Sequence, residues 1–134
     1  MKPWLASTGA VVAGFLVTAV ASIATDALMH AAGVFPDNTQ RMSGALFALA
    51  ASYRALFTVA GGYATARLAP SRPMRHAWIL AGFGLAAGIA GVVAYYLVGG
   101  AELGPAWYAF AIPVEALPCV WLGARIALAR RSAA

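Results

Sequence analysis

The hydrophobic pattern of the chain consists of long apolar runs separated by short connections. A helix that crosses the hydrocarbon core of a bilayer needs about 20 predominantly apolar residues. Runs of that length predict four transmembrane helices, at about residues 4–30, 43–67, 77–98 and 105–129. Glycine, proline and small polar residues fill the intervals, as is typical of turns. Because the connections are short, we expect neighbouring helices to run antiparallel in one up-down bundle, a single transmembrane domain over residues 1–134.

The composition agrees with a membrane protein. Hydrophobic residues make up 63% of the chain and charged residues 10%, whereas soluble domains contain about 45–50% and about 25%. This balance excludes a disordered chain, a nucleic-acid-binding domain and an ordinary cytosolic enzyme, and predicts an all-α membrane protein. The first apolar run is longer than the apolar region of a signal peptide, about 7–15 residues, so we expect it to be a retained helix.

Basic residues are divided unevenly between the two sides of the predicted bundle. Arg41 lies on one side, and Arg54 falls within a span. The other seven lie on the side of the termini and the second connection: Lys2, Arg67, Arg72, Arg75, Arg125, Arg130 and Arg131. The positive-inside rule places that side, with both termini, in the cytoplasm. It also accounts for the net charge of +5 without any nucleic-acid partner.

Two charged residues fall within predicted spans. Arg54 is eleven residues into the second span and Glu115 is ten residues into the fourth. At 1.5 Å per residue, both lie about 15 Å from the outer surface, near the middle of the bilayer core. Opposite charges at equal depth predict an ion pair between Arg54 and Glu115 in the bundle interior. Pro113 and Pro118 flank the carboxylate and disturb the helix, so both a structural pair and a charge pair in a binding pocket stay open.

The first helix carries a polar stripe at a spacing of four residues: Thr18, Ser22, Asp26 and His30. This spacing keeps the four side chains near one helix face. The stripe is either a polar vestibule leading toward Arg54 and Glu115, or hydrogen-bonding contacts between helices. Asp26 and His30, with Glu102, form only a weak metal-binding pattern. We therefore assign no metal, no cofactor and no catalytic residue, and the P-loop, HExxH and nucleophile-elbow motifs are absent from the sequence.

The third predicted helix is rich in glycine. Gly84 and Gly88 form a GxxxG pair, and Gly91 continues the small-residue face with Ala87. Small residues at this spacing allow close approach of two helix backbones. The face is therefore expected to pack inside the bundle or, alternatively, to form the seam of a homo-oligomer.

The region between residues 53 and 77 resembles a helical hairpin. The resemblance is carried by the sequences YRALF (53–57), GGYATARLAP (61–70) and MRHA (74–77). This region is similar to the hairpin between the second and third helices in a family of small bacterial inner-membrane proteins of unknown function. The resemblance covers about a third of the chain. It implies four helices and a bacterial inner membrane, and it transfers no activity.

These observations lead to three hypotheses about function. The leading one is a small non-enzymatic membrane protein whose polar pocket around Arg54 and Glu115 binds or passes a small solute or proton. We expect this protein to be an oligomer, since four helices enclose little space. The second is an accessory subunit that docks on a larger membrane complex through its glycine-rich helix. The third is an enzyme that modifies a lipid or isoprenoid, using Asp26, His30 and Glu102. The first predicts a hydrated cavity reaching mid-membrane, the second a dry core with an exposed glycine surface, and the third convergence of the three side chains within a few Å.

Overall fold

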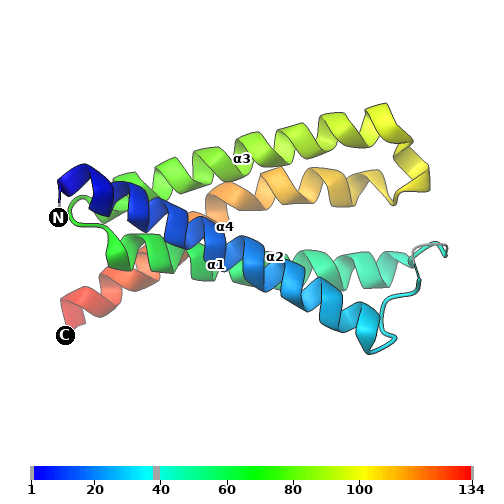
Figure 1. The fold of residues 1–134 in the computed structure, drawn as a ribbon, viewed down its shortest axis with the longest axis horizontal. Helices are drawn as coiled ribbons and strands as arrows, with labels where there is room; N and C mark the ends of the chain where they lie inside the picture. Colours follow the sequence, from blue (N-terminus) through cyan, green and yellow to red (C-terminus); the bar gives the residue numbers. More distant parts are fainter. Residues whose placement is uncertain (1, 38–39, 134) are drawn as a thin grey trace.

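The computed structural model describes residues 2–37 and 40–133, and within these ranges the chain forms a bundle of four long helices (Figure 1). The helices are α1 (Pro3–Ala31), α2 (Gly44–Leu68), α3 (Pro73–Val98) and α4 (Ala106–Ala133), and a short 3₁₀ helix, η1 (Gly100–Glu102), precedes α4. Each of the four is long and apolar enough to cross a membrane. The predicted all-helical bundle is therefore confirmed, and the chain is described below as a multi-pass membrane protein.

Consecutive helices run in opposite directions, so the two ends of the bundle differ (Figure 1). Both termini and the α2–α3 turn lie at one end, which we call the basic end. The α1–α2 and α3–α4 connections lie at the other end, which we call the acidic end.

The helix bounds differ from the prediction mainly in α3 and α4. α3 begins at Pro73 because proline is well accepted in the first turn of a helix, where its missing N–H is not needed. Arg72 precedes it with a left-handed φ of 44°. α4 extends to Ala133 and stays continuous through Pro113 and Pro118, although each proline removes one helical hydrogen bond. The helix is thus not broken at its prolines.

α1 and α2 cross at a pair of glycines. A Cβ atom on Gly14 would lie 2.6 Å from the carbonyl oxygen of Gly61, and one on Gly61 would lie 2.7 Å from that of Gly14. On either side of this crossing, Thr18 donates a hydrogen bond across to α2 at 3.3 Å, and Thr65 donates to the carbonyl of Ala10 at 3.1 Å. Only glycine permits backbones this close, so the pair fixes where the two helices cross.

α2 and α4 form the most extensive helix contact in the bundle. A Cβ on Gly62 would lie 2.3 Å from the carbonyl oxygen of Val120, and one on Gly123 would lie 1.9 Å from that of Val59. The adjacent glycines of α2 therefore serve two neighbours, because Gly61 faces α1 and Gly62 faces α4.

The glycine-rich face of α3 packs partly inside the bundle. A Cβ on Gly88 would lie 2.7 Å from the Cα of Pro113, and one on Gly84 would lie 3.3 Å from the Cβ of Ala116. Gly91 differs, because a Cβ there would meet no atom within 4 Å. The first two glycines thus bring α3 against α4, which favours internal packing over an oligomer seam at these positions.

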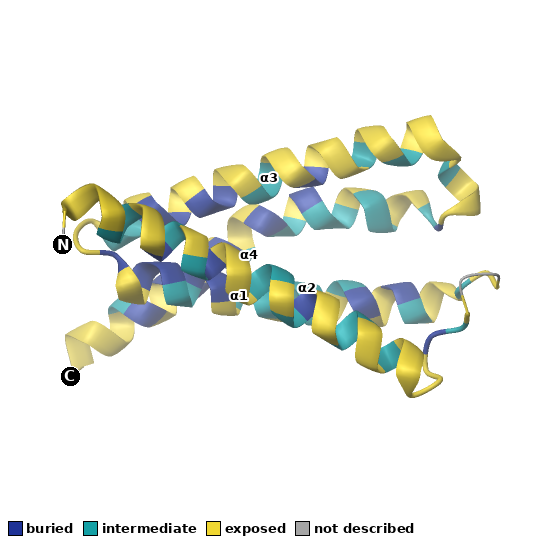
Figure 2. Ribbon diagram, in the orientation of Figure 1, coloured by how far each residue is buried: buried dark blue, intermediate teal, exposed yellow. Residues whose placement is uncertain are grey.

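The buried core lies toward the basic end (Figure 2). It consists of Ala66, Ala77, Leu80, Ala81, Val120, Ala124 and Ala127. Small side chains dominate this cluster, so the helices approach closely there. Toward the acidic end, the α1–α2 pair separates from the α3–α4 pair (Figure 1). This divergence opens the space that holds the candidate site.

Candidate functional site: an interhelical cavity

A cavity of about 670 Å³ lies between the helices and receives side chains from all four. Its floor includes Leu80 and Val120, which both belong to the buried core. The wall is largely apolar. The polar side chains on it are Thr18, Ser22, Arg54, Thr58, Tyr95, Tyr108 and Glu115. This size falls within the range of small-molecule sites, about 300–1,000 Å³.

A smaller and more polar space of about 290 Å³ adjoins the cavity at the acidic end, and we call it the vestibule. Its acidic, basic and histidine lining residues are Asp26, His30, Asp37, Arg41, Arg54 and Glu102. Phe47, Arg54, Leu103 and Tyr108 line both spaces. The two therefore meet at these four side chains.

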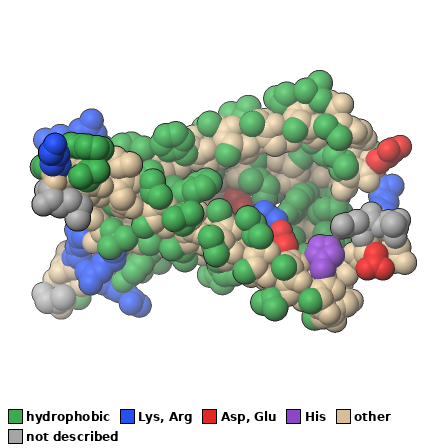
Figure 3. Space-filling view, in the orientation of Figure 1, with side chains coloured by type: hydrophobic (Ala, Val, Ile, Leu, Met, Phe, Trp, Pro, Cys, Tyr) green, Lys and Arg blue, Asp and Glu red, His purple; other side chains and the backbone are tan. Residues whose placement is uncertain are grey.

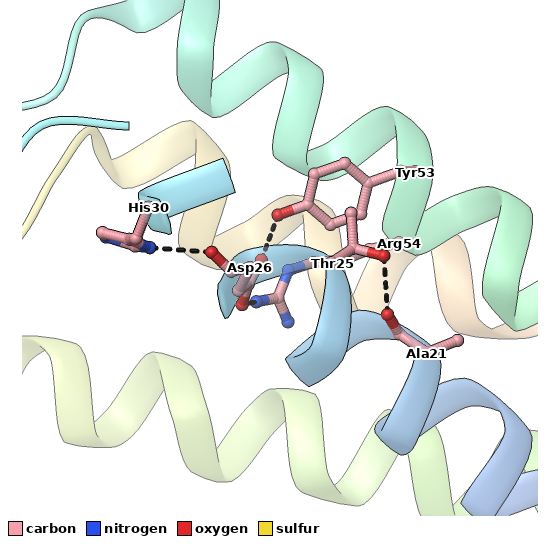
Figure 4. Close-up of polar contacts among 6 residues, drawn as sticks. All are labelled: Ala21, Thr25, Asp26, His30, Tyr53 and Arg54. Carbon is pink, nitrogen blue, oxygen red and sulfur yellow. Dashed lines mark hydrogen bonds and ion pairs between the residues drawn. The ribbon is translucent and has the colours of Figure 1, made fainter. Parts of the chain in front are cut away.

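Asp26 of α1 holds two consecutive side chains of α2 (Figure 4). The hydroxyl of Tyr53 donates a hydrogen bond to Oδ1 of Asp26, and Nη2 of Arg54 donates to Oδ2 and forms an ion pair. The side chains of Arg54 and Asp26 are 30% and 29% exposed. Nε of Arg54 is buried and has no hydrogen-bond partner among the described residues.

The structure thus gives Arg54 a different partner from the predicted Glu115. Near the crossing, Ala10 lies opposite Thr65 and Thr18 contacts Phe57. If the same antiparallel register continues along the two helices, Tyr53 lies opposite Ser22, which is about one helical turn before Asp26 on α1. Both α2 side chains are long enough to span that turn. Equal depth on two helices therefore did not identify the partner, because the adjacent helix α1 offered a carboxylate within reach.

Glu115 lies near the middle of α4, on the wall of the cavity that Arg54 also lines. The structure brings the two residues to one cavity without joining them as an ion pair. Over residues 2–37 and 40–133, no hydrogen bond or ion pair involves the Glu115 carboxylate. An ionised group in a largely apolar space is costly unless it is paired. Glu115 therefore presents to the cavity a carboxyl group that has no ion-pair partner among the described residues.

The polar stripe of α1 divides between the two spaces. Thr18 and Ser22 line the cavity, while Asp26 and His30 line the vestibule. Thr18 also donates to the carbonyl of Phe57, and Nδ1 of His30 lies 2.8 Å from the backbone carbonyl oxygen of Asp26. The stripe therefore contributes both a polar lining and hydrogen bonds between or within helices.

Asp26, His30 and Glu102 all line the vestibule, but they do not form a metal-binding cluster. In the part of the chain that the structure describes, no three His, Cys, Asp or Glu side chains lie close enough to hold a metal. The Asp26 carboxylate accepts hydrogen bonds from Tyr53 and Arg54 instead. Among the described residues, the three side chains therefore do not provide a metal-ligand set.

The cavity opens sideways between α1 and α3. α1 and α3 contact each other less extensively than α2 contacts any of the other three long helices, and less than α3 contacts α4. Phe15 and Ile23 of α1 and Val98 of α3 line the cavity, yet they are 51%, 67% and 71% exposed. In a membrane, this opening would face lipid over part of its height.

Sequence reasoning did not identify Tyr53 and Tyr108 as site residues. Tyr53 stabilises the Asp26 carboxylate, and Tyr108 lies at the junction of the cavity and the vestibule. A tyrosine next to an intramembrane arginine was the available signal for Tyr53, because a buried hydroxyl needs a hydrogen-bond partner. Tyr108 gave no such signal, since aromatic residues near a helix end are common at membrane interfaces.

No family model, curated protein or solved structure matches the chain. The family resemblance of the 53–77 hairpin therefore stays a prediction.

Proposed function

We propose that this protein binds a small, largely apolar molecule with one polar group in the cavity between its helices. The observation that carries the proposal is an apolar-walled cavity of about 670 Å³ that contains Arg54 and Glu115 at mid-helix positions. Apolar walls with a few polar groups are typical of small-molecule sites. Glu115 offers an acceptor without an ion-pair partner among the described residues, so a polar group on the ligand would satisfy what the protein leaves open.

The position of the buried core favours entry of a ligand from the acidic end or from the side of the bundle. Leu80 and Val120 form part of the cavity floor and belong to the buried cluster that fills the basic half. Passage through the bundle would require these side chains to move apart. One chain supplies the whole cavity, so an oligomer is not needed for binding. We place the protein in a bacterial inner membrane with the basic end in the cytoplasm, as the charge distribution favours.

The test is a binding titration with N-phenyl-1-naphthylamine, a neutral probe that fluoresces in apolar surroundings. The purified protein in lipid nanodiscs should show a saturable component of one probe per chain, above partition into lipid. Gly91→Trp should remove this component, because Gly91 lines the cavity and a side chain there meets open space.

The matched control is Gly82→Trp on the same helix. Gly82 also has open space beside it, but it does not line the cavity. The control should therefore bind the probe as the unsubstituted protein does. No saturable component, or equal loss in both variants, would contradict the proposal. An accessory subunit with a dry core would give the first of these results.

A further inference from the structure

The acidic residues of this protein are gathered around the two connected spaces. The whole sequence contains four carboxylates, and all of them line the cavity or the vestibule: Asp26, Asp37, Glu102 and Glu115. Of the nine basic residues, only Arg41 and Arg54 line either space. Four carboxylates against two guanidinium groups leave a net negative lining in a chain whose net charge is +5. Figure 3 shows the acidic groups toward the acidic end and the main basic clusters at the opposite end.

Among the described residues, Arg54 is the one arginine that lines the cavity itself, and Arg41 lines only the vestibule. Arg54 is paired with Asp26, and Nη2 of Arg41 donates to the carbonyl of Ala101 at 2.8 Å. Glu115 is the one acidic residue of the four that lines the cavity itself and, within the described ranges, it has no ion-pair partner. An anionic ligand in the cavity would meet this carboxylate, and the arginine on the same wall is already paired with Asp26. A cationic ligand would supply the missing opposite charge.

Aromatic side chains add to the preference for a cation. Phe15, Phe47, Tyr95 and Tyr108 line the cavity, and the rings of Phe47 and Tyr108 are 5.0 Å apart. The faces of aromatic rings attract cations, more strongly where water is excluded. The largely apolar remainder of the wall suits an aromatic or alkyl body.

We infer that the ligand is a lipophilic organic cation, an amine or onium ion with an apolar body, and that Glu115 is its counter-ion. This inference rests on the proposed function, because it names the chemical class that the same cavity takes. The charged group would lie near Glu115 and the body against the apolar wall. The sideways opening between α1 and α3 would admit such a molecule from the bilayer, where lipophilic cations accumulate.

The test compares two probes of nearly the same shape and opposite charge, tetraphenylphosphonium and tetraphenylborate. Each is titrated against the bound neutral naphthylamine in nanodiscs, and the signal of the Gly91→Trp variant is subtracted to remove partition into lipid. We expect tetraphenylphosphonium to displace the neutral probe with an affinity at least about tenfold higher than that of tetraphenylborate.

Glu115→Gln removes the charge and keeps the size of the side chain. It should bring the ratio of the two affinities close to one. Glu102→Gln removes an equal charge from an exposed position of the vestibule and should change the ratio by no more than about twofold, because solvent and salt screen that charge. Thermal unfolding of each variant establishes that it is folded.

The two proposals fail in different ways. If the neutral probe binds and the unsubstituted protein takes tetraphenylborate as well as tetraphenylphosphonium, the cation inference is wrong and the proposed function stands. A preference that survives Glu115→Gln would also overturn the inference, since another group would then be the counter-ion. If no probe binds above the Gly91→Trp background, both proposals are wrong. If Glu115→Gln does not fold, the comparison of the two tetraphenyl probes in the unsubstituted protein still decides whether the cavity prefers a cation.

Discussion

Asp26 is the residue on which the polar contacts between α1 and α2 converge. Its two carboxylate oxygens accept from Tyr53 and Arg54, which are neighbours in the sequence. Two donors on one carboxylate hold its position more firmly than one, and the ion pair keeps both charges from standing alone at this depth. The contact therefore fixes the register of the two helices where they separate toward the acidic end.

We predict that Asp26 and Arg54 are energetically coupled. Asp26→Leu or Arg54→Leu alone should lower the free energy of unfolding by about 1–3 kcal/mol, between the values typical of exposed and buried pairs. The double change should cost less than the two single changes together, because it leaves no orphan charge. Unfolding titrations in mixed micelles would measure the cycle.

Arg54→Leu combined with Glu115→Leu serves as the comparison for that cycle. These two residues share the cavity without an ion pair, so their coupling should be clearly smaller. A larger coupling energy for Arg54 with Glu115 than for Arg54 with Asp26 would contradict the prediction. It would show that Arg54 pairs with Glu115 in the membrane, as their equal depth suggested.

The sequence predicted which charged residues belong to the cavity better than it predicted the ion pair that Arg54 forms. Arg54 and Glu115 stood out because charges within apolar spans are costly, and both do line the cavity. The partner of Arg54 could not be predicted, since it depends on where Gly14 of α1 crosses Gly61 of α2. That crossing is a property of the assembled helices, and the hydropathy pattern of either helix alone does not specify it.

The helices approach one another through glycines that leave no room for a methyl group. The closest approach is between α2 and α4, where Gly62 and Gly123 each face a backbone carbonyl of the other helix. The basic half of the bundle is tight for this reason, and the acidic half is open where large side chains such as Phe47 and Tyr108 stand between the helices. The closeness at one end thus helps to create the cavity at the other.

We predict that Gly123→Ala destabilises the bundle by about 1–3 kcal/mol, the usual cost of overpacking. The added methyl group would meet the carbonyl of Val59 at 1.9 Å, so α2 and α4 must move apart. Gly82→Ala introduces the same methyl group into open space and should be neutral or slightly stabilising, because alanine favours a helix. Thermal unfolding in detergent compares the two, and equal melting temperatures would contradict the packing of α2 on α4.

At the scale of elements, long apolar runs were sufficient to predict the number and approximate extent of the helices. The GxxxG of Gly84 and Gly88 indicated a close helix contact, and the structure identifies α4 as its partner. The contact of Gly123 with α2 was not predicted, because Gly123 belongs to no GxxxG pair and its closeness to Val59 follows from the packing of two separate helices.

The whole molecule is electrically polar. The acidic residues gather around the cavity and vestibule, and most basic residues lie at the opposite end (Figure 3). The positive-inside rule relates this polarity to orientation, because cytoplasmic loops carry the excess of Lys and Arg. The acidic end would then face away from the cytoplasm, and so would the vestibule.

We predict that a cysteine at position 101 is labelled from outside intact cells and one at position 71 is not. Ser71 lies in the α2–α3 turn at the basic end, and Ala101 lies in η1 at the acidic end. The experiment uses a membrane-impermeant maleimide on Ser71→Cys and Ala101→Cys, each in a Cys119→Ala background. Permeabilised cells provide the control in which both positions react. The reverse pattern in intact cells would show that the basic end faces outward.

Thiol accessibility inside the bundle tests whether the cavity is open and able to hold a ligand. Ile112 lines the cavity, while Val114, two residues on, is 71% exposed on the outer surface of α4. In nanodiscs and a Cys119→Ala background, Ile112→Cys should react with a small water-soluble methanethiosulfonate much faster than Val114→Cys, which faces lipid. Saturating naphthylamine should slow the reaction at position 112 at least about tenfold and leave position 114 unchanged. Equal rates at the two positions, or no protection by the probe, would contradict an open ligand-binding cavity.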